Sequence, residues 1–318
     1  MPATTTSEVH GTPPGHSAVD VSTLPLERVN APMPFWRGFP AAVLEIWAYR
    51  ELLGQLVRKE LKVKYKDSVL GFFWTLLRPL LQLVVYSVAI GYFLGARFAI
   101  PDFGIYLFTG LVAWSFFADV VSGCTGSIVG NAGLINKVYF PRELFPLSVV
   151  GAAAVNFLLQ LSVLLLAYVA TWSWPDPGDL LLVPAALVVM ALFGLALGLV
   201  LAASNVYLRD MTYLVEVGLL LWFWMTPVVY AWSQVRESLT ESDLAWLVDV
   251  FLANPMANVV LAFQRALWPA GQTEEGAKIL FEGDLWLRLG VLALVSLALL
   301  WVAQRIFARA QGNFAKEL

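Results

Sequence analysis

Long apolar stretches separated by short polar connections dominate the chain from residue 69 onward. Each stretch approaches the roughly 20 residues that an α-helix needs to cross about 30 Å of hydrocarbon. The six stretches run over 69–95, 104–129, 144–171, 180–203, 211–232 and 286–307. The pattern therefore predicts an all-α integral membrane protein with six transmembrane helices in a domain of residues 69–308.

A different pattern precedes the first stretch, over residues 41–68. Leu53, Leu56 and Leu61 recur at helical spacing, and Lys and Arg fill the positions between them. We expect an amphipathic interface helix on the membrane surface, in contact with lipids, although a solvated helix packed on a domain would share the pattern. Its candidate cationic residues are Arg58, Lys59, Lys62 and Lys64.

The two ends of the chain are polar. Residues 1–34 are rich in Pro, Ser and Thr. This composition predicts a disordered tail over residues 1–40. The start of the chain lacks the basic region and apolar core of a signal peptide, so we expect the first span to direct insertion. Residues 309–318 are expected to form a second, short tail.

The connection 233–285 alternates polar and apolar segments. Two apolar segments of about a dozen residues flank Asn254, Pro255 and Met256, and each is too short to span a bilayer. We expect short re-entrant helices between the fifth and sixth spans, dipping into the membrane from one side or lying on its surface.

Positive charge indicates the orientation of the spans. Fourteen of the twenty Lys and Arg residues fall on the side that holds both termini and the 131–146 connection, and five fall on the other side. Because Lys and Arg are retained in the cytoplasm, both termini are predicted to be cytoplasmic and the connection 233–285 to face outward.

Composition excludes several classes of function. Only 14% of the residues are charged, against about 25% in soluble domains, and the net charge of -3 gives no reason to expect nucleic-acid binding. Cys124 is the single cysteine, and His10 and His16 both lie in the tail, so no metal site or Ser-His-Asp triad is expected. The chain also lacks the G-x-x-x-x-G-K-[ST] phosphate loop. We expect no enzymatic activity and no cofactor in this chain, so that any ATP hydrolysis would need a partner.

The best candidate for partner docking is the predicted cytoplasmic connection 131–146. Pro141 and Pro146 bracket a short helical turn there, although a plain loop with positive charges would look similar. The predicted coupling segment, 131–143, has these candidate residues: Asn131, Leu134, Lys137, Tyr139, Phe140, Arg142 and Glu143.

Aromatic and charged residues inside the spans suggest a substrate path. The apolar face of a sugar stacks on an aromatic ring, but Trp and Tyr also form the interfacial belts of any membrane protein. A guanidinium within a span either extends to lipid phosphates or meets a substrate diphosphate. Two embedded carboxylates, Asp119 and Glu216, lie either in subunit packing or on an aqueous path. The candidates for the path are Arg78, Trp114, Phe117, Trp222, Trp224 and Tyr230.

Five blocks in order resemble the membrane subunits of bacterial ATP-binding-cassette exporters for O-antigen polysaccharide and teichoic acid. The blocks are RKELKVKYKDSVLGFFWTLLRPL (58–80), NAGLINKVYFPRELFPLS (131–148), NVYLRDMTYLVEVGLLLWFWMTPVVY (205–230), NPM (254–256) and FAKEL (314–318). The resemblance implies a homodimer in the plasma membrane with two copies of an ATPase, which binds the ATP and Mg.

The same resemblance assigns roles to segments of the chain. It places the interface helix and residues 131–143 against the ATPase, and an outward gate at Asn254, Pro255 and Met256. The implied substrate is a lipid-linked glycan or wall polymer such as O-antigen, teichoic acid or galactan. An exporter of drugs or small lipids is the nearest alternative. A secondary transporter lacks support because no internal repeat or charge relay is evident, and a membrane glycosyltransferase would need a tighter acidic cluster.

Overall fold

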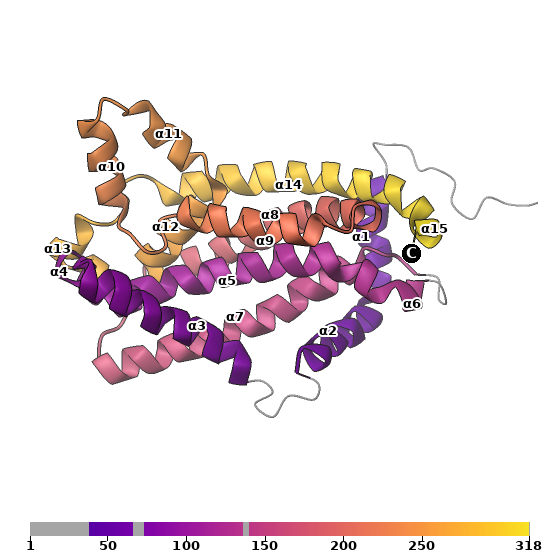
Figure 1. The fold of residues 1–318 in the computed structure, drawn as a ribbon, viewed down its shortest axis with the longest axis horizontal. Coiled ribbons are helices and arrows are strands. Elements are labelled where there is room, and N and C mark those ends of the chain that lie inside the picture. Colours follow the sequence, from indigo (N-terminus) through magenta and orange to yellow (C-terminus); the bar gives the residue numbers. More distant parts are fainter. Residues whose placement is uncertain (1–37, 66–72, 136–139, 318) are drawn as a thin grey trace, which may run out of the picture. The chain divides into compact units, whose positions relative to one another are not determined.

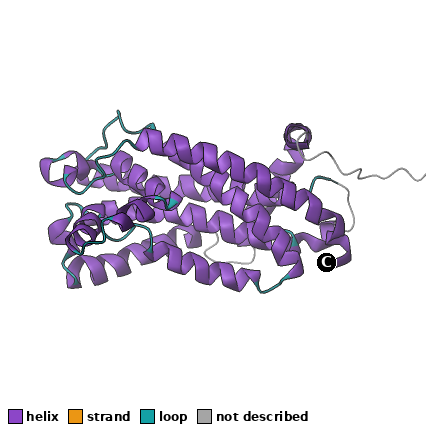
Figure 2. Ribbon diagram, turned by 90° about the horizontal axis from the view of Figure 1, so that it is seen from above, coloured by secondary structure: helices purple, strands orange, loops and turns teal. Residues whose placement is uncertain are grey.

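A computed structural model describes residues 38–65, 73–135 and 140–317 of the chain. All regular elements in these ranges are helices, as Figure 2 shows. Four long helices run alongside one another in Figure 1, and the all-helical prediction is confirmed. They are α5 (Phe103–Ser127), α7 (Leu144–Thr171), α8 (Leu182–Tyr207) and α14 (Leu285–Ala310).

Helix α5 forms the centre of this bundle. It packs against α7 and α8, and most of its residues are buried, as expected for a helix that is apolar on all sides. Gly198 of α8 lets the two helices approach closely, because a Cβ atom there would lie 2.5 Å from the Cβ of Cys124. Small residues at such crossings are typical of helix packing in membranes.

The structure contains five described helices that are long and apolar enough to cross a membrane, or six if the bent pair α11 (Trp246–Leu252) and α12 (Pro255–Leu267) counts as one span. Four of the predicted spans match long helices within a few residues. The predicted span 211–232 is too long, because α9 ends after 14 residues, at Met211–Trp224. Pro227 explains this end, since proline disfavours helical geometry in the residue before it.

The first predicted span, 69–95, consists of α3 (Phe73–Tyr86) followed by a π-helical turn at Ser87–Phe93 and by α4 (Ala96–Ala99). Pro79 lies inside α3, where it removes one backbone hydrogen bond, as is tolerated in membrane helices. Gly91 packs against Phe103 at the start of α5.

The predicted interface helix 41–68 is divided into two helices, α1 (Gly38–Ala48) and α2 (Arg50–Tyr65). Helix α2 packs on α7 and buries Leu56, whereas its Lys and Arg side chains are exposed. The placement of α2 on a membrane surface stays a prediction. Helices α1, α2, α6 (Ala132–Ile135) and α15 (Phe314–Glu317) lie at one end of the bundle, called here the basic end (Figure 1).

The other end of the bundle holds the segments of the 233–285 connection. These are α10 (Trp232–Glu241), α11, α12, a short 3-10 turn at Pro269–Gln272 and α13 (Glu274–Ala277). Helices α11 and α12 meet at 79°, and nearly all of α12 is buried against α5 and α8. Trp268 fixes the end of α12, where its Nε1 donates to the carbonyl of Pro101 over 3.0 Å. The second of the two short helices is therefore part of the bundle core.

Candidate functional site: a charged and aromatic groove

A groove of about 700 Å³ lies between α3, α5, α7, α9 and the last turn of α2. We call it the α3–α9 groove. Three embedded charges that are far apart in the sequence, Arg78, Asp119 and Glu216, line it together with Lys64. The other lining residues are Trp74, Pro79, Gln82, Tyr86, Trp114, Ser115, Ala118, Ser122, Gln160, Leu219, Leu220 and Phe223.

Helical periodicity explains why these residues share one groove. On α3 the lining residues Trp74, Arg78, Gln82 and Tyr86 are spaced four apart, so they form one stripe along the helix. The lining positions on α5 and α9 follow the same spacing of three or four. At 1.5 Å per residue, the stripe from Trp74 to Tyr86 extends about 18 Å along α3.

The directions of the helices separate the charged part of the groove from an aromatic part. Arg78, Asp119 and Glu216 lie nearer the basic end on their helices, and Tyr86, Trp114 and Phe223 lie deeper. The Phe223 ring lies 5.6 Å from Trp114 and 5.9 Å from Tyr86, measured between ring centroids. The three rings pack together at the deep end of the groove.

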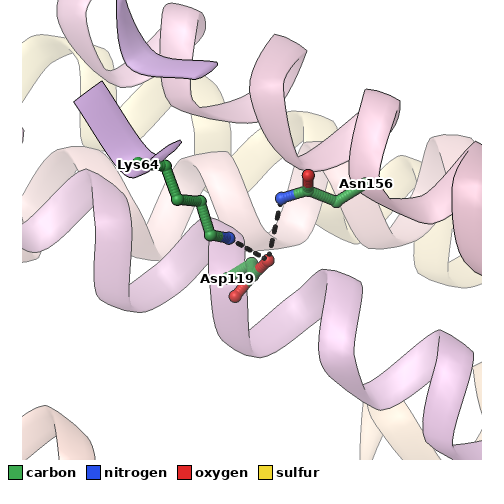
Figure 3. Close-up of polar contacts among 3 residues, drawn as sticks. All are labelled: Lys64, Asp119 and Asn156. Atoms are coloured by element: carbon green, nitrogen blue, oxygen red, sulfur yellow. Dashed lines mark hydrogen bonds and ion pairs between the residues drawn. The ribbon is translucent and has the colours of Figure 1, made fainter. Parts of the chain in front are cut away.

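Asp119 on α5 binds polar groups from two other helices, as Figure 3 shows. Its Oδ2 lies 3.3 Å from Nζ of Lys64 on α2 and accepts a hydrogen bond of 3.3 Å from Nδ2 of Asn156 on α7. The side chains of Lys64 and Asp119 are 46% and 33% exposed, so the ion pair faces the groove and is open to water.

Gln160 on α7 is the most deeply buried polar residue of the groove. It is 4% exposed, and its Oε1 has no hydrogen-bond partner among the residues that the structure describes. An unpaired buried acceptor costs about 1–3 kcal/mol. The wall of the groove therefore contains a buried acceptor that no described residue satisfies.

The predicted path residues occupy different places. Arg78 and Trp114 line the α3–α9 groove, but Phe117 is completely buried and packs between Phe193 and Trp222. Trp222 donates from Nε1 to Oδ1 of Asn254 over 2.8 Å. Trp224 and Tyr230 do not line the groove either. Trp224 is half-exposed on α9, and the hydroxyl of Tyr230 donates to the Trp224 carbonyl.

The predicted gate residues begin α12. Asn254 caps the helix by accepting from the Met256 amide over 3.0 Å, and Pro255 occupies the first helical turn. The Asn254 Nδ2 donates to the carbonyl of Met225 and to the hydroxyl of Thr226, each over 3.2 Å. Met256 is fully buried. This network joins the start of α12 to the end of α9.

The described part of the coupling segment packs at the basic end. Asn131 accepts a hydrogen bond from Lys59 of α2 and donates to the Ser127 carbonyl over 2.8 Å. Leu134 is partly buried in the apolar cluster at this end, and Phe140 packs against Phe145. Lys137 and Tyr139 lie outside the described residues.

Two charged residues complete the segment. Arg142 donates to the carbonyl of Gln311 and lies 5.7 Å from the ring of Phe314, so it holds the carboxyl-terminal helix. Burial raises the pKa of the Glu143 carboxyl above its usual range, and its neighbours Gln304 and Arg142 oppose the shift. The basic residues of α2, the segment 131–143 and the chain end thus meet at one end of the bundle.

Several groove residues were not predicted from the sequence. They are Trp74, Gln82, Tyr86 and Gln160. Asn156, which does not line the groove but binds the Asp119 carboxylate, was not predicted either. The four-residue spacing on α3 was a usable signal for the first three, because it places Trp, Arg, Gln and Tyr on one helical face. Asn156 and Gln160 share the same spacing on α7, but nothing in the sequence links that face to α3.

A helical membrane bundle with a polar, aromatic groove is the architecture of a transport protein. The chain belongs to the ABC-2 type transporter family, which matches residues 51–268. It is a multi-span membrane permease of that family, and the resemblance inferred from the five sequence blocks is confirmed.

The individual relatives are polysaccharide transport proteins. The O-antigen export system permease protein RfbA of Myxococcus xanthus is 34% identical over 276 residues, which cover 87% of this chain and 98% of that protein. A protein of the same name from Klebsiella pneumoniae is 29% identical over 214 residues, or 67% of this chain and 79% of that protein. The polysialic acid transport protein KpsM of Escherichia coli is 24% identical over 118 residues, or 37% of this chain and 44% of that protein.

Proposed function

We propose that this chain is the membrane subunit of an ATP-driven exporter that moves a lipid-linked polysaccharide or wall polymer across the plasma membrane. The observation that carries the proposal is the α3–α9 groove, which brings charged, amide and aromatic side chains together on a partly open face of an apolar bundle. Embedded charges are costly in a membrane and are typical of a substrate pathway. The names of the relatives supply the class of substrate.

The groove offers each kind of contact that a lipid-linked glycan needs. Gln82 can exchange hydrogen bonds with sugar hydroxyls, and the partly exposed ring of Tyr86 can stack on a sugar face. Arg78 presents a guanidinium that binds phosphate oxygens in pairs, which suits the diphosphate between lipid and glycan. In this assignment the diphosphate lies near the basic end and the sugars lie deeper.

The basic end is proposed to face the cytoplasm and to dock the ATPase. Positive charge concentrates on α2, where Arg58 and Lys62 are exposed. The segment 131–143 and the carboxyl-terminal helix pack beside it. Movement of the ATPase on binding ATP would then shift α2 and the segment 131–143 together, because Lys59 and Asn131 join them.

A second copy of the chain is proposed to complete the path. The apolar faces of α3 and α9 that flank the groove are exposed, for example at Val84 and Val85 on α3 and at Val217 and Leu221 on α9. Pairing two chains along these faces would bring two α3–α9 grooves together. The start of α12 at Asn254 would then control the outward end.

The test combines export with assembly. Deletion of the chain should abolish surface polymer, and the full-length chain should co-purify with the ATP-binding protein encoded beside it. Charge reversal of two exposed α2 residues, Arg58→Glu with Lys62→Glu, should remove the ATPase and leave the thermal stability unchanged. The matched control is Lys278→Glu, an exposed lysine of the other end. Normal export in the deletion strain would refute the proposal.

A further inference from the structure

The Lys64–Asp119 ion pair joins the end of α2 to the wall of the α3–α9 groove (Figure 3). Lys64 lies in the last turn of α2, and Asp119 lies two-thirds of the way along α5. Asn156 donates to the same carboxylate oxygen that faces Lys64. The carboxylate is therefore held in place by α7, while the lysine reaches it from a different and shorter helix.

The other attachments of α2 include the hydrogen bond from Lys59 to Asn131 and two apolar contacts. Leu56 is buried in the apolar cluster at the basic end, and Val57 packs so closely on α7 that a Cβ at Gly151 would lie 2.6 Å from its Cγ2. The Lys64–Asp119 pair is partly exposed to water, and such a pair shifts an equilibrium only about two- to fivefold. It is the one of these attachments that lines the groove, so a change in the groove reaches it first.

Lys64 and Arg78 both line the groove, so an anion that binds Arg78 lies within the same cavity as the lysine. A diphosphate carries more negative charge than one carboxylate and offers more acceptor oxygens, and an ammonium group binds phosphate well. A phosphate-bearing ligand in the groove therefore competes with Asp119 for Lys64.

We propose that the Lys64–Asp119 pair is a latch, which fastens the end of α2 to the groove until the phosphate groups of a ligand take over Lys64. The inference rests on the proposed function, because it takes the ligand to be the diphosphate of a lipid-linked glycan and α2 to lie on the ATPase-facing surface. Release of the latch frees the end of α2. Binding of a ligand in the groove thereby changes the mobility of the ATPase-facing surface.

The test uses the full-length chain in nanodiscs, with a spin label on Val63→Cys, which is exposed and adjacent to Lys64. Cys124 is completely buried and stays unlabelled. We expect Asp119→Asn to increase the mobile fraction of the label about two- to fivefold. Farnesyl diphosphate should produce the same change in the unsubstituted chain and no further change in Asp119→Asn, and farnesol should produce none.

Two further variants separate the pair from its single residues. Lys64→Gln should reproduce the effect of Asp119→Asn, so the test survives if one variant folds poorly. The exchange Lys64→Asp with Asp119→Lys should restore the low mobility, because it restores the pair. The control variant Lys278→Gln, at the other end of the bundle, should behave as the unsubstituted chain.

The latch is wrong if Asp119→Asn and Lys64→Gln leave the label as immobile as before, or if farnesyl diphosphate does not mobilise it. The readout needs no ATPase, so it is independent of the proposed function. A label that responds in a chain that binds no ATPase would support the latch and refute the exporter assignment.

Discussion

The two sides of α5 are built differently. On one side α5 packs against α8 and α12, where close contacts such as Gly198 on Cys124 leave no space and Trp268 and Asn254 have their hydrogen bonds satisfied. On the other side α5 faces the α3–α9 groove, with a partly exposed ion pair between Lys64 and Asp119. Buried amide oxygens that no described residue pairs occur on both sides, at Gln160 on the groove side and at Asn205 and Asn258 on the packed side. The comparison indicates that the first side provides stability through close packing and that the second side keeps charged groups accessible to water and to a ligand.

The largest effect is expected at the start of α12, on the packed side. Asn254→Ala removes the cap of α12 and the partners of Trp222 and Thr226, so we expect the free energy of unfolding to fall by about 2–4 kcal/mol. Thermal unfolding of the purified chain in detergent measures this loss. Asn254→Asp keeps the acceptor oxygens and should cost less, and equal losses in both variants would contradict the assigned network.

On the groove side, Arg78→Gln should impair transport and leave the fold intact. The loss of charged hydrogen bonds to a phosphate corresponds to about 1.5–3 kcal/mol, or about a 10- to 100-fold lower rate of export at limiting substrate. Surface polymer measured by antibody binding reports the rate, and the unfolding temperature should not change. Arg97→Gln, whose guanidinium lies 4.4 Å from the Tyr92 ring outside the groove, is the control, and an equal export defect there would argue against a groove-specific role.

A methyl group added at a glycine tests how closely α5 and α8 are packed. Gly198→Ala places a Cβ 2.5 Å from that of Cys124, so the helices must move apart, at a cost of about 1–3 kcal/mol. Gly126→Ala on α5 meets no atom within 4 Å and should be neutral or slightly stabilising. Unfolding temperatures of the two variants test this difference, and equal values would mean that α5 and α8 are not closely packed.

The smallest effect is a gain of stability in the groove. Gln160→Leu removes a buried oxygen that has no partner, so we expect about 1 kcal/mol of added stability together with reduced export. Thermal unfolding and surface polymer are measured on the same variant. A variant that is less stable than the unsubstituted chain would show that Gln160 contributes to packing and not to ligand binding.

Much of the fold was predictable because long apolar runs leave few alternatives in a membrane protein. The run 144–171 coincides with α7, since a helix satisfies its own backbone hydrogen bonds in lipid. The predicted span 211–232 was too long because hydropathy continues through Pro227, whereas the helix does not. The break of the amino-terminal helix at Tyr49 had no sequence signal that we could identify.

The site was predictable only in part. The cost of an embedded charge singled out Arg78, Asp119 and Glu216 one by one, but it did not place them together. It was harder still to predict which aromatic residues line the groove. Trp114 and Phe117 lie three residues apart on α5, yet only Trp114 lines it.

The sequence by itself determined that this protein is an α-helical membrane protein and where its polar positions fall along each span, because both follow from hydropathy and from the 3.6-residue period of a helix. Its membership of a permease family followed from the resemblance of the five sequence blocks and not from hydropathy. Only the tertiary structure decided that α2, α3, α5, α7 and α9 turn polar positions toward one groove. The reason is physical: the apolar surfaces of membrane helices are chemically alike, so local pattern does not choose neighbours. Close packing at residues such as Gly198 and Gly151 makes that choice, and it places Lys64 beside Asp119.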